Sequence, residues 1–146
     1  MEYEKPKRTL AEVFRDKREA FSDEIQTGIK LLSNIKNIPE VQVTFLSMRQ
    51  RLLEENHVLL EHFTQMKKKY RERKGEEWAD ASKIGQIRYQ STEKATIVDG
   101  RVAELREKLE RLENQIKFYS ESITTVDSVL WGIKDRIAAQ KLLDGN

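Results

Sequence analysis

The sequence predicts an all-α protein, and two observations support that class. The 146 residues include 36% charged side chains but only two Pro and six Gly, a composition that suits long helices better than sheets. Apolar residues also recur at helical spacing, and between Val98 and Ile137 the spacing alternates four and three, as in a helix packed along a partner helix. We expect two antiparallel helices, a short irregular segment and a long C-terminal heptad helix, assembled into a helical homo-oligomer within a single helical domain.

The first predicted helix covers residues 9–36 and follows a mobile polar arm at residues 1–8. Thr9 and Glu12 have the spacing of a capping box, in which each side chain satisfies a free backbone amide. Gly28 weakens this helix slightly. The apolar face consists of Leu10, Val13, Phe14, Phe21, Ile25, Ile29, Leu32 and Ile35.

The second predicted helix covers residues 39–74, because Pro39 suits a first turn and Gly75 suits a C-terminal stop. The short connection favours antiparallel packing against the first helix. Leu46, Leu53 and Leu60 widen the apolar stripe, which suggests contact with more than one helix. The seam consists of Val41, Phe45, Met48, Leu52, Leu59, Phe63, Met66 and Tyr70.

Residues 75–97 are the least regular part, and we expect a loop that holds one short helix. The long helix is predicted over residues 98–143. Asp99-Gly100 is one possible start, with Asp99 as the cap. A start near Thr92, with Gly100 tolerated inside the helix, fits nearly as well.

The long helix carries an uninterrupted apolar seam that contains no polar residue. Its 40 residues from Val98 to Ile137 would extend roughly 60 Å, and a compact domain of this size cannot surround such a rod. Up to Leu112 we expect a charged strut that packs within its own subunit. The intersubunit surface is expected on the aromatic-rich part, at Ile116, Tyr119, Ile123, Val126, Leu130, Ile133 and Ile137.

Several function classes receive no support from the sequence. Without cysteine there is no disulfide or thiolate metal site. His57 and His62 are five residues apart, so they do not share a helix face as i,i+4 metal ligands would. No phosphate loop or nucleophile motif is present. We therefore expect a non-enzyme without cofactor or metal. Since the chain has neither a membrane-length apolar run nor a secretory signal at its start, we expect a cytoplasmic protein with no membrane partner.

A basic run interrupts an otherwise balanced charge distribution. Residues 41–74 carry eight basic and four acidic side chains, although the whole chain has a net charge of only +2. One interpretation is that these cations favour a helix C-terminus and aid solubility. The other is that they contact nucleic-acid phosphates while a tyrosine stacks on a base. From the residues alone both interpretations stay open. The candidate DNA-binding residues are Lys67, Lys68, Lys69, Tyr70, Arg71, Arg73, Lys74, Arg88 and Tyr89.

The C-terminal region resembles a known family. The match begins with an apolar residue and an aromatic pair in the segment 116–119, IKFY. An apolar-rich helix follows without a gap and reaches the segment 130–136, LWGIKDR. Ala139 and Lys141 continue the match. This region, 119–142, is similar to the C-terminal region of the UvsY-like recombination mediators of T-even-type phages. The segment 66–75, MKKKYRERKG, corresponds to that family's basic, Tyr-containing segment. The long Glu/Arg/Leu heptad before Phe118 departs from the family pattern.

The resemblance implies a non-enzymatic mediator that forms rings of six or seven subunits and binds single-stranded DNA. Such proteins help a RecA-like recombinase displace the single-strand-binding protein, here in the cytoplasm of an infected bacterial host. Ring contacts would fall on Ile123, Val126, Leu130, Ile133 and Ile137, and DNA binding on residues 67–74. The alternative from the residues is a structural or adaptor coiled coil that binds only protein.

Overall fold

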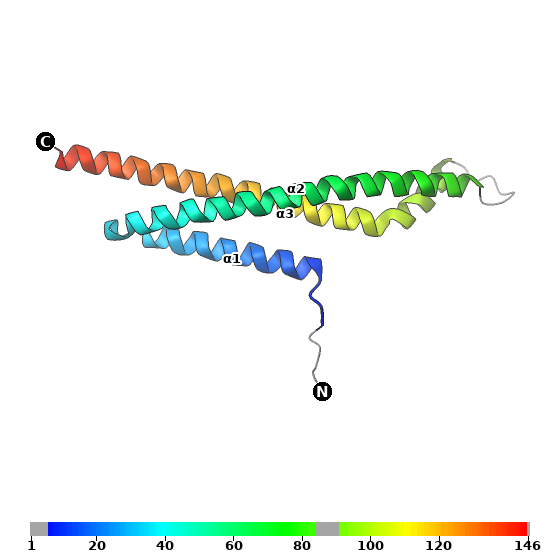
Figure 1. Cartoon of the computed structure of the whole chain (residues 1–146), viewed down its shortest axis with the longest axis horizontal. Helices are drawn as coiled ribbons and strands as arrows, with labels where there is room; N and C mark the ends of the chain where they lie inside the picture. The colour runs from blue at the N-terminus through cyan, green and yellow to red at the C-terminus, as the bar shows by residue number, and fades with distance from the viewer. Residues whose placement is uncertain (1–5, 84–90, 146) are drawn as a thin grey trace, which may run out of the picture. The chain divides into compact units, whose positions relative to one another are not determined.

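The chain is all-helical in the residues that the structure, a computed structural model, describes, namely 6–83 and 91–145. The elements are α1 (Leu10–Leu31), the 3-10 helix η1 (Ile35–Asn37), α2 (Ile38–Lys83) and α3 (Ser91–Asp144), and no strand occurs in these ranges. Figure 1 shows their course. The predicted fold class is confirmed to this extent, while assembly into a homo-oligomer stays a prediction.

The contacts of the chain group it into two compact units. The first unit comprises residues 1–56 and 117–146, and the second comprises residues 57–116. Because α2 and α3 are long, each contributes one part to each unit. The units are described separately below, and the single-domain interpretation stays a prediction.

The start of α1 confirms the predicted capping box. The Thr9 side chain accepts a hydrogen bond from the Glu12 amide, and the Glu12 carboxylate accepts one from the Thr9 amide. The helix ends at Leu31, however, and not near residue 36 as predicted. Asn34 is extended and its side chain accepts from the Lys36 amide, while the Asn37 side chain donates to the Leu31 carbonyl. These local hydrogen bonds compete with the helix and end it early.

The predicted stop at Gly75 is wrong, because α2 continues through it to Lys83. A glycine inside a helix costs only about 1 kcal/mol relative to alanine, and Glu77 and Ala81 beyond it are buried. The alternative start of α3 near Thr92 is confirmed, since the helix begins at Ser91 and includes Gly100. The irregular segment predicted at 75–97 is therefore helical wherever it is described, and residues 84–90 lie outside the described residues.

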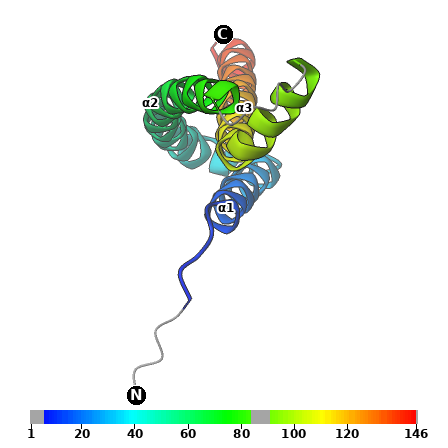
Figure 2. The same cartoon turned by 90° about the vertical axis from the view of Figure 1, so that its right-hand side faces the viewer.

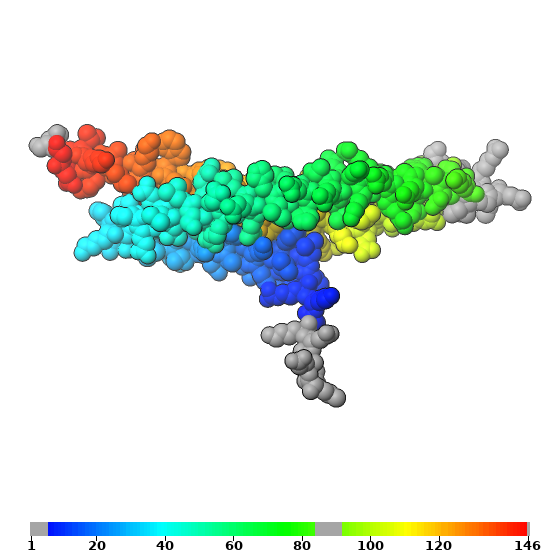
Figure 3. Space-filling view, in the orientation of Figure 1, coloured from blue at the N-terminus to red at the C-terminus, as the bar shows by residue number. Residues whose placement is uncertain are grey.

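The first unit has a hydrophobic core formed by α1, the first part of α2 and the last part of α3. Gly28 is buried where α1 meets α2, and a Cβ atom at this position would lie 2.7 Å from Cζ of Phe45. Figure 3 shows α1 lying closely against α2. The predicted seam of α2 is confirmed here, and the most deeply buried apolar side chains of the unit are Val41, Phe45, Met48, Leu52, Tyr119, Val126 and Ile133.

Polar contacts join the three helices of the first unit around one aromatic pair. The rings of Phe21 and Tyr119 meet edge to face, with centroids 5.9 Å apart. The Tyr119 hydroxyl donates to the Glu55 carboxylate, which also accepts from Lys17 at 3.2 Å. Since Lys17, Glu55 and Tyr119 come from α1, α2 and α3, the network fixes the register of all three.

The buried face of α3 differs from the predicted seam at two positions. Gln115 and Ser122 are buried, whereas their neighbours Ile116 and Ile123 are only half-buried. The seam itself contains no polar residue, but the packed face of α3 also includes these two polar residues beside it. In the first unit α3 contacts both α1 and α2, as the Phe21–Tyr119 ring pair and the Arg49–Asp127 ion pair show.

The second unit consists of the later part of α2 and the earlier part of α3, which lie side by side in Figures 1 and 2. Val98, Val102 and Leu112 of α3 are buried, as predicted for a strut packed within its own subunit. The seam residues of α2 in this unit are only half-buried: Leu59, Phe63, Met66 and Tyr70.

Candidate nucleic-acid interface

The basic run lies inside α2 and not at its end. It finishes at Lys74, whereas the helix continues to Lys83. The helix dipole acts on charges within the last turn, so it does not account for six cations this far from the C-terminus. The dipole part of the first interpretation therefore no longer applies, while solubility and phosphate contact both stay open as reasons for the run.

Most side chains of the run point into solvent. Lys67, Lys68, Lys69, Arg71 and Arg73 are exposed, whereas Tyr70 and Lys74 are half-buried. Within the described ranges, Lys69 and Arg71 form no ion pair. The ammonium of Lys68 lies 4.0 Å from Glu72, a distance at which an exposed pair contributes little.

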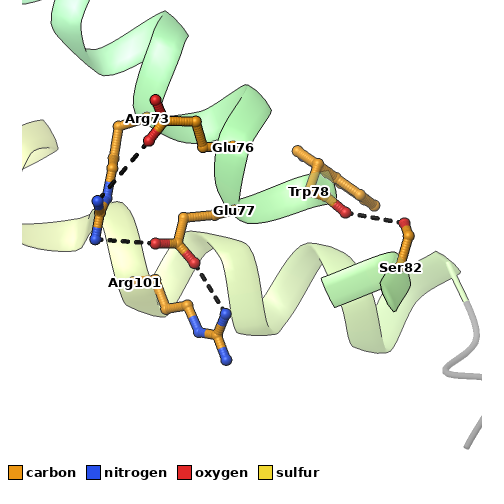
Figure 4. Close-up of polar contacts among 6 residues, drawn as sticks. All are labelled: Arg73, Glu76, Glu77, Trp78, Ser82 and Arg101. Atoms are coloured by element: carbon orange, nitrogen blue, oxygen red, sulfur yellow. Dashed lines mark hydrogen bonds and ion pairs between the residues drawn. The ribbon is translucent and has the colours of Figure 1, made fainter. Parts of the chain in front are cut away.

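Arg73 differs from the rest of the run because a buried carboxylate holds it. The Glu77 side chain is 8% exposed, and its two oxygens lie 3.0 Å from Arg73 and 2.9 Å from Arg101. Figure 4 shows Glu77 between the two guanidinium groups, one on α2 and the other on α3. This pair of contacts connects the two helices and holds the guanidinium of the exposed Arg73 against Glu77.

Tyr70 is held in place through its hydroxyl. Arg106 of α3 donates to the Tyr70 hydroxyl at 3.1 Å and to the Asp99 carboxylate at 3.0 Å. The hydrogen bonds that Arg106 donates to Tyr70 and Asp99 raise the pKa of its guanidinium. Lys74 also lies near Tyr70, with its ammonium 5.7 Å from the centre of the Tyr70 ring.

A groove of about 320 Å³ runs between α2 and α3 beside the run. The wall from α2 carries two cations, and the wall from α3 carries two carboxylates together with the Arg106 guanidinium. Aromatic and aliphatic side chains lie between them. The lining residues are Phe63, Lys67, Tyr70, Arg71, Arg106, Leu109, Glu110 and Glu113.

The sequence prediction missed the contribution of α3 to this site. Arg101 and Arg106 were not among the predicted residues, although antiparallel pairing of the two long helices would have placed them near the run. Glu77 of α2, just after the run, was missed as well. Arg88 and Tyr89, which were predicted, lie outside the described residues.

The structure divides the predicted oligomerisation residues into two groups. Tyr119, Val126 and Ile133 are at most 1% exposed and belong to the core of the first unit, so they present no surface to another subunit. This corrects their predicted placement. The half-buried group, which stays accessible, consists of Ile116, Ile123, Leu130 and Ile137.

Other apolar side chains of the first unit are exposed near this accessible group. Trp131 is 62% exposed and has the Lys134 ammonium 4.7 Å from its ring centre. A hollow of about 490 Å³ beside it contains Leu46 and Leu130. A larger apolar hollow of about 960 Å³ lies between η1 and the last turns of α3, with Ile35 and Leu143 in its lining.

No cation site emerges from the described part of the chain. There, no three His, Asp or Glu side chains come close enough to hold a metal ion, and both His57 and His62 are exposed. Over the same ranges, no helix has a stretch that is both long and apolar enough to cross a membrane. Protein-family models, curated proteins and solved structures provide no match to this chain.

Proposed function

We propose that this protein is a non-enzymatic, homo-oligomeric mediator of recombination that binds single-stranded DNA through the basic run. In this role it helps to load a RecA-like recombinase onto strands coated with single-strand-binding protein. The observation that carries the DNA-binding proposal is the place of the run: six cations, most of them exposed, lie well inside α2. Phosphate contacts account for their number and position.

The accessible apolar residues of the first unit support self-association. Ile123, Leu130 and Ile137 lie on the edge of the buried face, and Trp131 is exposed beside them. Several copies around a common axis would place their basic runs along one strand, which raises affinity without new contacts in each subunit. The mediator role, a ring of six or seven subunits and the two protein partners rest on the family resemblance.

The DNA-binding proposal is tested by replacing Lys67, Lys68, Lys69 and Arg71 with alanine. We expect this variant to lose binding to a fluorescent single-stranded oligonucleotide while its native mass stays that of the wild-type oligomer. For the wild type, the plot of log affinity against log salt should have a slope of roughly −0.7 per phosphate contact.

A control variant removes the same number of charges elsewhere. Lys7, Arg15, Lys30 and Lys36 are exposed in the first unit, and their replacement with alanine should leave most of the affinity. Retained binding in the first variant, or equal loss in both, would contradict the assignment of the run. A monomeric wild type would contradict self-association.

An adaptor that binds only protein is the second candidate. The observation in its favour is the nearly balanced charge of residues 57–116, which contain 13 basic and 11 acidic side chains. A gel shift at low and moderate salt separates the two candidates, since the adaptor would leave the oligonucleotide unshifted at both.

A further inference from the structure

The groove beside the basic run is lined by two opposed stripes. On α2 the stripe consists of Phe63, Lys67, Tyr70 and Arg71, and on α3 it consists of Arg106, Leu109, Glu110 and Glu113. Each stripe follows the i, i+3, i+4, i+7 spacing or its close variant, so its members share one helix face. Both stripes belong to the second unit.

The cations and carboxylates of the groove do not neutralise each other. Among the described residues, Glu110 and Glu113 form no ion pair, and Lys67 and Arg71 form none either. In contrast, Glu107 on the same helix pairs with Arg111 at 2.9 Å. The groove thus presents free positive charge on one side and free acceptors on the other.

Phe63 offers an aromatic face within this groove. Its ring is half-buried and has the Lys67 ammonium over it, at 5.8 Å from the ring centre. An exposed cation over phenylalanine is a weak contact, whereas a nucleobase gains more by stacking on an aromatic ring. A base would therefore displace Lys67 from the ring, and the freed ammonium could neutralise a phosphate.

The geometry points to a pocket for one unstacked nucleobase per subunit, with Phe63 as the stacking surface and with Glu110 and Glu113 as acceptors for its exocyclic amino group. This inference rests on the proposed DNA binding and adds a base-reading element to it. Carboxylates accept hydrogen bonds from the N4 amino group of cytosine, whereas thymine has a carbonyl oxygen at that position. The pocket should thus prefer cytosine over thymine.

The test measures fluorescence anisotropy with three oligonucleotides of equal length: oligo-dC, oligo-dT and an abasic strand. The abasic strand keeps the phosphates and removes the bases. We expect the wild type to bind oligo-dC tightest and the abasic strand weakest. Phe63→Leu, which keeps an apolar side chain, should weaken binding to oligo-dC roughly tenfold and leave abasic binding unchanged.

The carboxylates are tested by the double variant Glu110→Gln, Glu113→Gln. It should remove the dC preference over dT, which we expect to be about threefold to tenfold in the wild type. Glu104→Gln, Glu107→Gln is the matched control, because it removes two exposed charges from the same helix outside the groove. This control should bind every strand more tightly and keep the dC/dT ratio.

The outcomes separate this inference from the proposed function. If the wild type binds all three strands equally, DNA binding stands and the base pocket is wrong. If Phe63→Leu weakens abasic and base-containing strands alike, or if both double variants change the dC/dT ratio equally, the pocket is also wrong. If no strand binds, the DNA-binding proposal itself fails, and the pocket fails with it.

Discussion

The two units of the chain differ in how their helices are held together. In the first unit three helices enclose a core of large apolar side chains, and Phe45, Met48 and Leu52 are fully buried. In the second unit two helices contact each other, and the side chains between them include a buried carboxylate, Glu77. The first unit thus contains the larger apolar core, and the second unit carries the exposed basic run.

The difference follows from the number of helices in each unit. A third helix covers apolar surface that two helices leave half-exposed, and each fully buried large side chain contributes about 1.5–3 kcal/mol. Ion pairs join helices in both units, for example Arg49 with Asp127 in the first and Arg101 with Glu77 in the second, and exposed pairs contribute at most about 1 kcal/mol each. Substitutions matched between the units should therefore have unequal effects.

The largest effect is expected for Phe45→Ala. Phe45 is fully buried in the first unit, so its truncation should lower the free energy of unfolding by about 3–5 kcal/mol. Phe63→Ala in the second unit should cost about 1–2 kcal/mol, because that ring is only half-buried. Urea denaturation followed by circular dichroism measures both, and equal losses would contradict the contrast between the units.

Local sequence signals predicted most of the fold. The capping box at Thr9 and the seam through Phe45 and Leu52 depend on spacing alone, and spacing is visible in the sequence. The failed prediction of a stop at Gly75 depends on tertiary contacts, because α2 passes Gly75 where Glu77 and Ala81 beyond it are buried. No local pattern contains that information.

Only part of the candidate site was predicted from the sequence, because the rest of it depends on tertiary contacts. The basic run was evident from composition, but its place within α2 was not, because α2 extends to Lys83. The residues on α3 that complete the site, such as Arg106 and Glu110, look like any solvated heptad charge. Only the pairing of the two helices distinguishes them from Glu104 or Lys108.

The next effect concerns glycines, for which the same substitution should have opposite signs in the two units. A Cβ atom at Gly28 would lie 2.7 Å from Cζ of Phe45, so Gly28→Ala should destabilise the first unit by about 1–3 kcal/mol through overpacking. A Cβ atom at Gly100 of the second unit meets nothing within 4 Å. Gly100→Ala should therefore stabilise α3 by about 0.5–1 kcal/mol.

Thermal unfolding of the two variants gives the sign of each effect directly. Gly132→Ala is the control for position, because Gly132 also meets nothing within 4 Å but lies in the first unit. It should be stabilising like Gly100→Ala. A destabilising Gly132→Ala would show that the first unit resists any added side chain, and the contrast would then not depend on the contact with Phe45.

The smallest effect on stability, and the sharpest test of the division between the units, concerns two carboxylates. Glu77→Gln weakens the contacts with Arg73 and Arg101 around a side chain that is 8% exposed, and we expect a loss of about 1–2 kcal/mol. Asp127→Asn in the first unit affects a pair with Arg49 at 2.6 Å in which both side chains are 39% exposed, and its cost should be about 0.2–1 kcal/mol.

These two variants should differ more in DNA binding than in stability. Glu77→Gln frees Arg73 at the end of the basic run, so single-stranded DNA should bind more tightly by a few-fold, with a salt slope steeper by about 0.7 for one added contact. Asp127→Asn removes the same charge from the first unit and should leave the slope unchanged. If both variants raise affinity equally with no change in slope, net charge alone accounts for the gain. The gain in DNA affinity would then not depend on the basic run of the second unit.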